Sequence, residues 1–166
     1  GITLEDKRAI TEALLKSGAP INEINTVRKH ISAYKGGWLA KAVYPATMIN
    51  LILSDVIGDP LDAIASGPTV PDNTTFMDAK YILEKYNLWT NLASSIHNVI
   101  LEGIRGNIKE TPKPADPAFK KVYNIIIGNN KVSTIAALNY LKMKGLNTLL
   151  LSTTLEGETK QVGKDL

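Results

Sequence analysis

The feature that most constrains the fold is a strand, helix and strand pattern in the last third of the chain. Residues 122–127 form a short apolar run, the turn 128–130 follows, and an amphipathic pattern then extends to Lys144. A glycine precedes a second apolar run at residues 148–151. Strands joined through a helix lie parallel, with a right-handed crossover as the strong default. The pattern therefore predicts an α/β fold with a parallel sheet flanked by helices.

The rest of the chain alternates helical patterns with one more apolar run. We expect helices at 3–17, from Ile21 to near Gly36-Gly37, at 75–86, at 90–105 and from about 158, and a strand buried on both faces at 47–53. The segment 54–72 is rich in Asp, Gly, Pro and Ser, and loops of that length are usually functional or mobile. The proline-rich segment 107–117 is predicted to cross the surface.

Composition excludes several classes of protein. The 166 residues are 44% hydrophobic and 21% charged, which is typical of a folded globular domain. No run approaches the roughly 18–20 apolar residues that span a bilayer, so no membrane association is expected. The net charge of +3 is spread among interspersed charges, and only two Phe and two Trp are present, so nucleic-acid binding is not expected. The absence of cysteine suits a reducing cytoplasm.

The end of the strand at 47–53 carries the most informative polar residues. Asp55 and Asp59 follow the strand directly, and Gly58 permits a tight backbone path between them. Ligands of parallel sheets bind at the carboxyl ends of strands, and Mg²⁺ favours one or two carboxylates with water and phosphate oxygens. The two aspartates are therefore candidate metal or phosphate-site residues, although turn formation alone would explain them equally well.

Three other segments could hold an anion. The small and hydroxyl residues of 65–69 could form an anion-binding nest, and Arg28 and Lys35 could hold a carboxylate or phosphate. A structural turn and a solvated helix face explain the same residues. The turn 128–130 has the context of a phosphate or sugar site, but it is not G-x-G-x-x-G, and the chain contains no Walker A motif.

Taken together, these segments resemble the class II glycerate kinases. The matching words, in the family's order, are NTVRKH at 25–30, KGG at 35–37, LSDVIGD at 53–59, IASGPTVPD at 64–72, TF at 75–76, ETPK at 110–113, GNN at 128–130 and LEGE at 155–158. The resemblance implies a Rossmann-like, three-layer αβα domain. It also implies Mg²⁺-dependent transfer of the γ-phosphoryl group of ATP to D-glycerate, usually at the 2-hydroxyl, and some family members are labelled hydroxypyruvate reductases.

The resemblance also assigns site residues. It implies catalytic roles for Asp55, Lys35 and Arg28, and metal binding by Asp55 and Asp59. The substrate or phosphate would be bound by Asn25, Lys29, Gly36, Gly37, Ser54, Gly58, Ser66, Gly67 and Thr69, and the nucleotide by Gly128, Asn129 and Asn130.

Two departures from the family pattern affect these assignments. Asn129 stands where a small hydroxyl residue is expected, which weakens the nucleotide assignment. Family members are much longer, with a Gly-rich segment upstream and a further α/β domain downstream. Residues 1–166 would then be an incomplete Rossmann-like domain, inactive by itself.

Two functions of other classes remain open from the sequence. The chain could be a non-catalytic module that binds a nucleotide or a sugar-acid phosphate, or part of an NAD(P)-dependent hydroxypyruvate reductase. The sequence does not choose the oligomeric state, and a homo-oligomer stays open.

Overall fold

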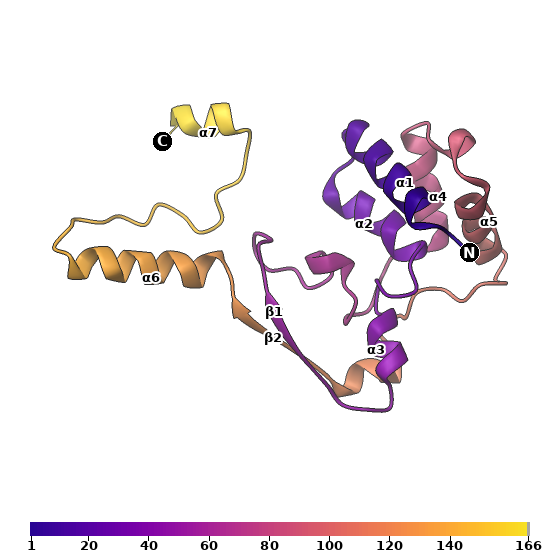
Figure 1. Cartoon of the computed structure of the whole chain (residues 1–166), viewed down its shortest axis with the longest axis horizontal. Coiled ribbons are helices and arrows are strands. Elements are labelled where there is room, and N and C mark those ends of the chain that lie inside the picture. The colour runs from indigo at the N-terminus through magenta and orange to yellow at the C-terminus, as the bar shows by residue number, and fades with distance from the viewer. Residues whose placement is uncertain (166) are drawn as a thin grey trace. The chain divides into compact units, whose positions relative to one another are not determined.

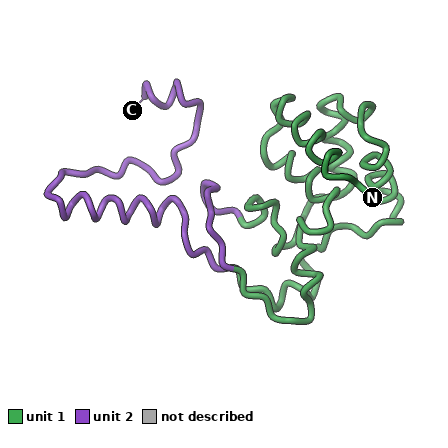
Figure 2. Tube along the Cα trace, in the orientation of Figure 1, with its two compact units in different colours: residues 1–50, 61–124 green, residues 51–60, 125–166 purple. Residues whose placement is uncertain are grey.

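The computed structural model describes residues 1–165, which divide into two compact units (Figures 1 and 2). The first unit comprises residues 1–50 and 61–124, and the second comprises residues 51–60 and the chain from residue 125 onward. Within the described residues, no helix is both long and apolar enough to cross a membrane.

The first unit is largely helical. Its helices are α1 (Leu4–Lys16), α2 (Ile21–His30), α3 (Trp38–Val43), α4 (Phe76–Lys85) and α5 (Ser94–Ile104), with short 3-10 turns η1 (Ile64–Ser66), η2 (Trp89–Asn91) and η3 (Pro117–Lys121). The predicted helix from Ile21 therefore ends at His30 and not near the glycine pair, because the chain turns after Ile31 to pack the glycines against a neighbouring loop.

Reciprocal capping defines where two of these helices begin. The Thr3 hydroxyl accepts a hydrogen bond from the Asp6 amide at 3.1 Å, and the Asp6 carboxylate accepts one from the Thr3 amide at 3.2 Å. Thr75 and Asp78 form the same arrangement at the start of α4. Each capping box satisfies two amide groups that the helix itself leaves unpaired, and the box predicted at Thr3 is confirmed.

The core of the first unit lies among α1, α2, α4 and α5. Their apolar side chains recur at helical spacing and are almost completely buried. The fully or nearly fully buried ones are Ile10, Leu14, Ile24, Val27, Phe76, Ala79, Ile82, Leu83, Ile96 and Ile100.

Two strands form a parallel pair. The strands are β1 (Met48–Leu53) and β2 (Val122–Gly128). The side chain of Asn50 bonds to that of Asn124, and the amide of Ser54 bonds to the carbonyl of Gly128. The register thus advances in the same direction along both strands, as parallel pairing requires. The predicted α/β class is confirmed.

The second unit contains the carboxyl ends of both strands and the helices α6 (Asn130–Met143) and α7 (Thr159–Asp165). The predicted strand at 148–151 was wrong, because this segment has no regular secondary structure and pairs with no described strand. The expected burial of β1 on both faces was also wrong, since Leu53 is 75% exposed. An apolar pattern identifies side chains that could be buried, but burial requires a packing partner, and no residue of α6 is buried.

The segment 107–117 differs from prediction as well. Thr111 is 2% exposed and belongs to a buried polar network, so only part of this segment lies on the surface.

The contact between α4 and α5 generates a test of packing. A Cβ atom added at Gly103 would lie 2.3 Å from the Phe76 ring, far inside van der Waals contact. We expect Gly103→Ala to lower the free energy of unfolding by roughly 2–3 kcal/mol, because the buried ring has little room to move. Thermal and urea unfolding followed by circular dichroism measures the change.

Gly163→Ala in α7 is the matched control, since an added Cβ there meets no atom within 4 Å. It should be neutral, or stabilising by up to about 1 kcal/mol through helix propensity. Equal stability of the two variants would contradict the packing argument.

Candidate functional site

A pocket at the carboxyl ends of β1 and β2 unites two segments that were predicted separately. It measures about 400 Å³ and lies wholly within the second unit. Its lining residues are Leu53, Ser54, Asp55, Gly128, Asn129, Asn130 and Ser133. The Ser54 amide donates to the Gly128 carbonyl at 2.9 Å, so continued strand pairing holds the two segments together. This is the place where ligands of parallel sheets bind.

Asn129 forms two side-chain hydrogen bonds at the N-terminus of α6. Its side-chain oxygen accepts a hydrogen bond from the Val132 amide at 2.9 Å and thereby caps the helix. Its side-chain nitrogen donates to the Asp59 carboxylate at 2.5 Å. An asparagine has both an acceptor and donors, so it performs two tasks that a hydroxyl residue would perform less fully. The departure from the family pattern thus has a structural role here.

In the turn after β1, Asp55 and Asp59 differ in exposure and in hydrogen bonding. Gly58 and Asp59 both adopt positive φ angles, of 77° and 54°, and the Asp59 amide donates to the Val56 carbonyl at 3.1 Å. The Asp59 carboxylate is partly occupied by Asn129, whereas Asp55 is exposed in the wall of the pocket. Of these two carboxylates, only that of Asp55 lines the pocket.

The donor set of this turn fits Mg²⁺. The turn carries two carboxylates, those of Asp55 and Asp59. Mg²⁺ is commonly bound in this way, with water and substrate phosphate oxygens completing its shell. Asp55 and one oxygen of Asp59 could supply the protein ligands.

The first unit holds the remaining predicted residues. The Asn25 side-chain oxygen accepts hydrogen bonds from the Ser66 hydroxyl at 2.8 Å and from the Arg28 guanidinium at 3.4 Å. The Lys35 ammonium donates to the Ala65 carbonyl at 2.8 Å. Asn25 and Ser66 are buried, whereas Arg28 and Lys35 are partly exposed. Arg28 and Lys35 thus each make one hydrogen bond to the protein and remain partly exposed, while Asn25 and Ser66 hold the loop in place.

The glycine pair contacts the 64–69 loop through its backbone. The amides of Gly36 and Gly37 donate to the carbonyls of Ser66 and Gly67 at 2.9 and 2.8 Å. Gly37 has a φ of 87°, and a Cβ there would lie 2.8 Å from the Phe119 ring and 2.9 Å from the Val70 carbonyl oxygen. These amides are therefore engaged in packing two segments together and are not directed at a ligand.

The 64–69 loop itself is strained. Ala65, Ser66 and Gly67 follow one another with positive φ angles of 52°, 63° and 61°. Two non-glycine residues in this region cost of order 1–3 kcal/mol each, and such strain concentrates at functional sites. Thr69 ends the loop with a buried hydroxyl that donates to Asn124 at 2.7 Å and accepts from Asn50 at 3.1 Å. These hydrogen bonds leave Thr69 a structural role in this unit.

Lys29 is placed in the interior. It is 5% exposed, and its ammonium lies 3.2 Å from a carboxylate oxygen of Asp72, which is 1% exposed. Hydrogen bonds from Thr74 and Thr111 complete the surroundings of Asp72. The structure therefore disfavours the predicted contact between Lys29 and phosphate, because its ammonium is buried and paired.

Buried His30 and half-buried Glu110 form a second contact that sequence reasoning missed. The Nδ1 of His30 donates to the Thr26 carbonyl at 2.8 Å, and its Nε2 lies 2.9 Å from the Glu110 carboxylate. Burial alone would raise the pKa of Glu110, but hydrogen bonds from His30 and from the Phe76 and Thr111 amides lower it to about 2. The two partners are 80 residues apart, so no local pattern could have revealed them.

The predicted site residues thus fall into two sets. Ser54, Asp55, Gly58, Asp59 and the turn 128–130 belong to the second unit, and all the others belong to the first. The structure brings residues together within each set.

The chain matches the family model described as a domain of unknown function, DUF4147, over residues 1–101, and it belongs to that family. Several of its curated relatives are named glycerate kinases, and one, from Agrobacterium vitis and 44% identical over 98% of this chain, is named a putative hydroxypyruvate reductase. It is 51% identical to the glycerate 2-kinase of Pyrococcus horikoshii over 98% of this chain, 44% identical to the D-glycerate 2-kinase of Thermotoga maritima over 99%, and 38% identical to human glycerate kinase over 98%. These alignments cover 36%, 36% and 30% of the respective relatives, so the chain spans about a third of their length.

Two solved structures have the same fold. One is a Pyrococcus horikoshii protein with a TM-score of 0.79 and 50% identity, covering 99% of this chain and 37% of that one. The other is the glycerate kinase of Thermotoga maritima with a TM-score of 0.74 and 44% identity, covering 90% and 33%. The resemblance to glycerate kinases inferred from the sequence is confirmed.

The buried Lys29–Asp72 pair generates the second prediction. We expect Lys29→Met to lower the free energy of unfolding by about 3–5 kcal/mol, because it leaves Asp72 as an unpaired buried charge. Urea denaturation measures the change. Lys16→Met, which removes one partner of an exposed pair with Glu12, should cost no more than about 1 kcal/mol. Similar costs for the two variants would contradict the structural role of Lys29.

Glu110 generates a prediction on pH. Its folded-state pKa of about 2 is below the ordinary value of 4.5, so its contribution to stability is fully present above about pH 4.5 and is lost as the pH falls toward 2. The difference in unfolding free energy between the wild type and Glu110→Gln should therefore shrink over that range. Urea denaturation at pH 7, 4 and 3 measures it.

Glu84→Gln on an exposed helical face is the control and should change stability little at pH 7. A wild-type advantage over Glu110→Gln that stays constant from pH 7 to pH 3 would contradict the prediction.

Proposed function

We propose that this chain carries part of the active site of an ATP-dependent glycerate kinase. The reaction would transfer the γ-phosphoryl group of ATP to the 2-hydroxyl of D-glycerate and give 2-phosphoglycerate. The observation that carries the proposal is the pocket at the strand ends, where exposed Asp55 lies beside the N-terminus of α6. The choice of substrates is based on the glycerate kinases to which the chain is similar over nearly its whole length.

The second unit supplies groups suited to phosphoryl transfer. Such transfer depends mainly on positioning and on neutralising the charge of the transferred group. The N-terminus of a helix as long as α6 carries partial positive charge that favours phosphate oxygens, and Ser54 and the turn 128–130 lie beside it. The Asp55 carboxylate could orient the attacking hydroxyl and accept its proton, or it could bind Mg²⁺.

Mg²⁺ would supply charge neutralisation at the phosphate oxygens, and Asp55 and Asp59 are the residues that we propose to hold it. In the first unit, Arg28 and Lys35 would bind an anionic group of a ligand, because both are partly exposed and neither has a carboxylate partner among the described residues. The strained 64–69 loop would position Lys35 through the Ala65 carbonyl. We place the reaction in the cytoplasm, whose reducing conditions suit a chain without cysteine.

The test is an assay of ADP release by the full-length gene product with ATP, Mg²⁺ and D-glycerate. Glycerate-dependent ADP release is expected, and Asp55→Asn should lower kcat by roughly 100-fold or more because the positioned carboxylate is lost. Asp62→Asn is the matched control, since Asp62 is an exposed aspartate of the same long loop outside the strand-end pocket. Circular dichroism checks that both variants fold.

The outcomes separate the candidate functions. ADP release that does not depend on glycerate, or an Asp55→Asn enzyme as active as Asp62→Asn, would contradict the proposal. Oxidation of NADH or NADPH by the same protein with hydroxypyruvate would favour the reductase. Saturable ATP binding without turnover would favour a binding module.

A further inference from the structure

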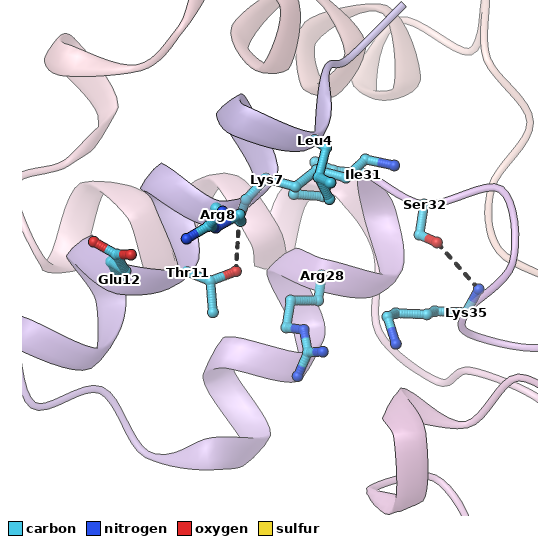
Figure 3. Close-up of a pocket in the computed structure, with 9 residues that line it drawn as sticks. All are labelled: Leu4, Lys7, Arg8, Thr11, Glu12, Arg28, Ile31, Ser32 and Lys35. Atoms are coloured by element: carbon cyan, nitrogen blue, oxygen red, sulfur yellow. Dashed lines mark hydrogen bonds between the residues drawn. The ribbon is translucent and has the colours of Figure 1, made fainter.

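A second pocket lies between α1 and α2 in the first unit. It measures about 350 Å³, and its lining residues are Leu4, Lys7, Arg8, Thr11, Glu12, Arg28, Ile31, Ser32 and Lys35. Figure 3 shows Lys7 and Arg8 extending from α1, Arg28 extending from α2 and Lys35 lying on the loop that follows. Four cationic side chains thus come from three separate segments to one cavity.

The described residues do not balance the charge of this pocket. Among residues 1–165, none of the four cations has a carboxylate oxygen within 4 Å. The one acidic lining residue, Glu12, pairs instead with Lys16 at 3.9 Å. Burial lowers the pKa of Lys35, and the nearby charges of Arg28 and Lys7 lower it further. A bound anion would relieve this repulsion, since opposite charge favours the protonated amine.

The shape and lining of the pocket indicate the class of anion. Leu4 and Ile31 supply an apolar wall, so the ligand should have a carbon skeleton as well as charge. A cavity of this size is at the lower end for small-molecule sites. A phosphate monoester carries about −1.5 to −2 charges at neutral pH, and an added carboxylate brings the total to about −2.5 to −3, which approaches the combined charge of the four cations and Glu12. Arg28 and Arg8 could each bind such groups with two parallel hydrogen bonds.

We infer that the α1–α2 pocket binds a small phosphorylated carboxylic acid, and that Lys7 and Arg8 are binding residues together with Arg28 and Lys35. The identity of that acid as the phosphorylated hydroxy acid made by the enzyme rests on the proposed function. The cation cluster and the pocket are independent of it. Lys7 and Arg8 were not singled out from the sequence, because charged residues in a first helical turn ordinarily face solvent.

The test is titration calorimetry of the full-length gene product without ATP or Mg²⁺, using 2-phosphoglycerate, D-glycerate and inorganic phosphate as probes. We expect 2-phosphoglycerate to bind at least about tenfold more tightly than D-glycerate. The double variant Lys7→Met/Arg8→Met should weaken its binding at least about tenfold, because charge-assisted hydrogen bonds are lost. Lys16→Met, on the same helix but outside the pocket, should change the affinity less than about twofold.

A second measurement locates the ligand without any substitution. Bound 2-phosphoglycerate should protect Lys7 and Lys35 from acetylation by acetic anhydride, followed by mass spectrometry, and should leave Lys16 unprotected. Unchanged affinity in the folded double variant, or equal acetylation of Lys7 and Lys35 with and without the ligand, would overturn the inference.

These readouts separate the site from the proposed reaction. If 2-phosphoglycerate protects Lys7 and Lys35 and binds the double variant more weakly, but the protein shows no glycerate-dependent ADP release, the pocket is supported and the proposed kinase function is contradicted. An active kinase in which the double variant binds 2-phosphoglycerate like the wild type would overturn the pocket alone.

Discussion

The buried charge network around α2 is the interaction on which the helical unit depends. Lys29 and His30 are adjacent in sequence, and they reach Asp72 and Glu110 in two distant loops. Lys29, His30 and Asp72 are buried and Glu110 is half-buried, so each polar group requires its partner, and the partners fix where both loops pass. One short stretch of helix thereby sets the position of the 64–74 region, of the segment around Thr111 and of the start of α4, whose first amide donates to Glu110.

The other side of the same stretch of helix carries a cation that is partly exposed. Arg28 is partly exposed and has no carboxylate partner among the described residues, whereas Lys29 beside it is buried and paired. Consecutive residues on a helix point about 100° apart, so a run of cations is divided between the interior and the pocket side. Residue type alone does not show which cations lie on which side. The position of each residue around the helix separates the cations that stabilise the unit from those that line the pocket.

The parallel pairing of β1 and β2 has the corresponding role in the second unit. Because the strands run in the same direction, their carboxyl ends meet, and the Ser54-Asp55 turn lies next to the turn 128–130. Asn129 then caps α6 and holds Asp59 with the same side chain. The sequence predicted each of the two turns separately as a strand-end ligand site, and parallel pairing is what brings the two together.

The sequence by itself determined the helices other than α3 and the end of α2, the two paired strands, the family and the strand-end location of one candidate site. These follow from local periodicity, capping residues and short motifs, which act over a few residues. Only the tertiary structure decided that Lys29 is buried, that His30 meets Glu110, that the segment 148–151 has no strand partner and that Lys7 and Arg8 face a pocket. Each of these depends on which distant segments pack together, and side-chain burial and charge pairing are set by those contacts and not by the local pattern.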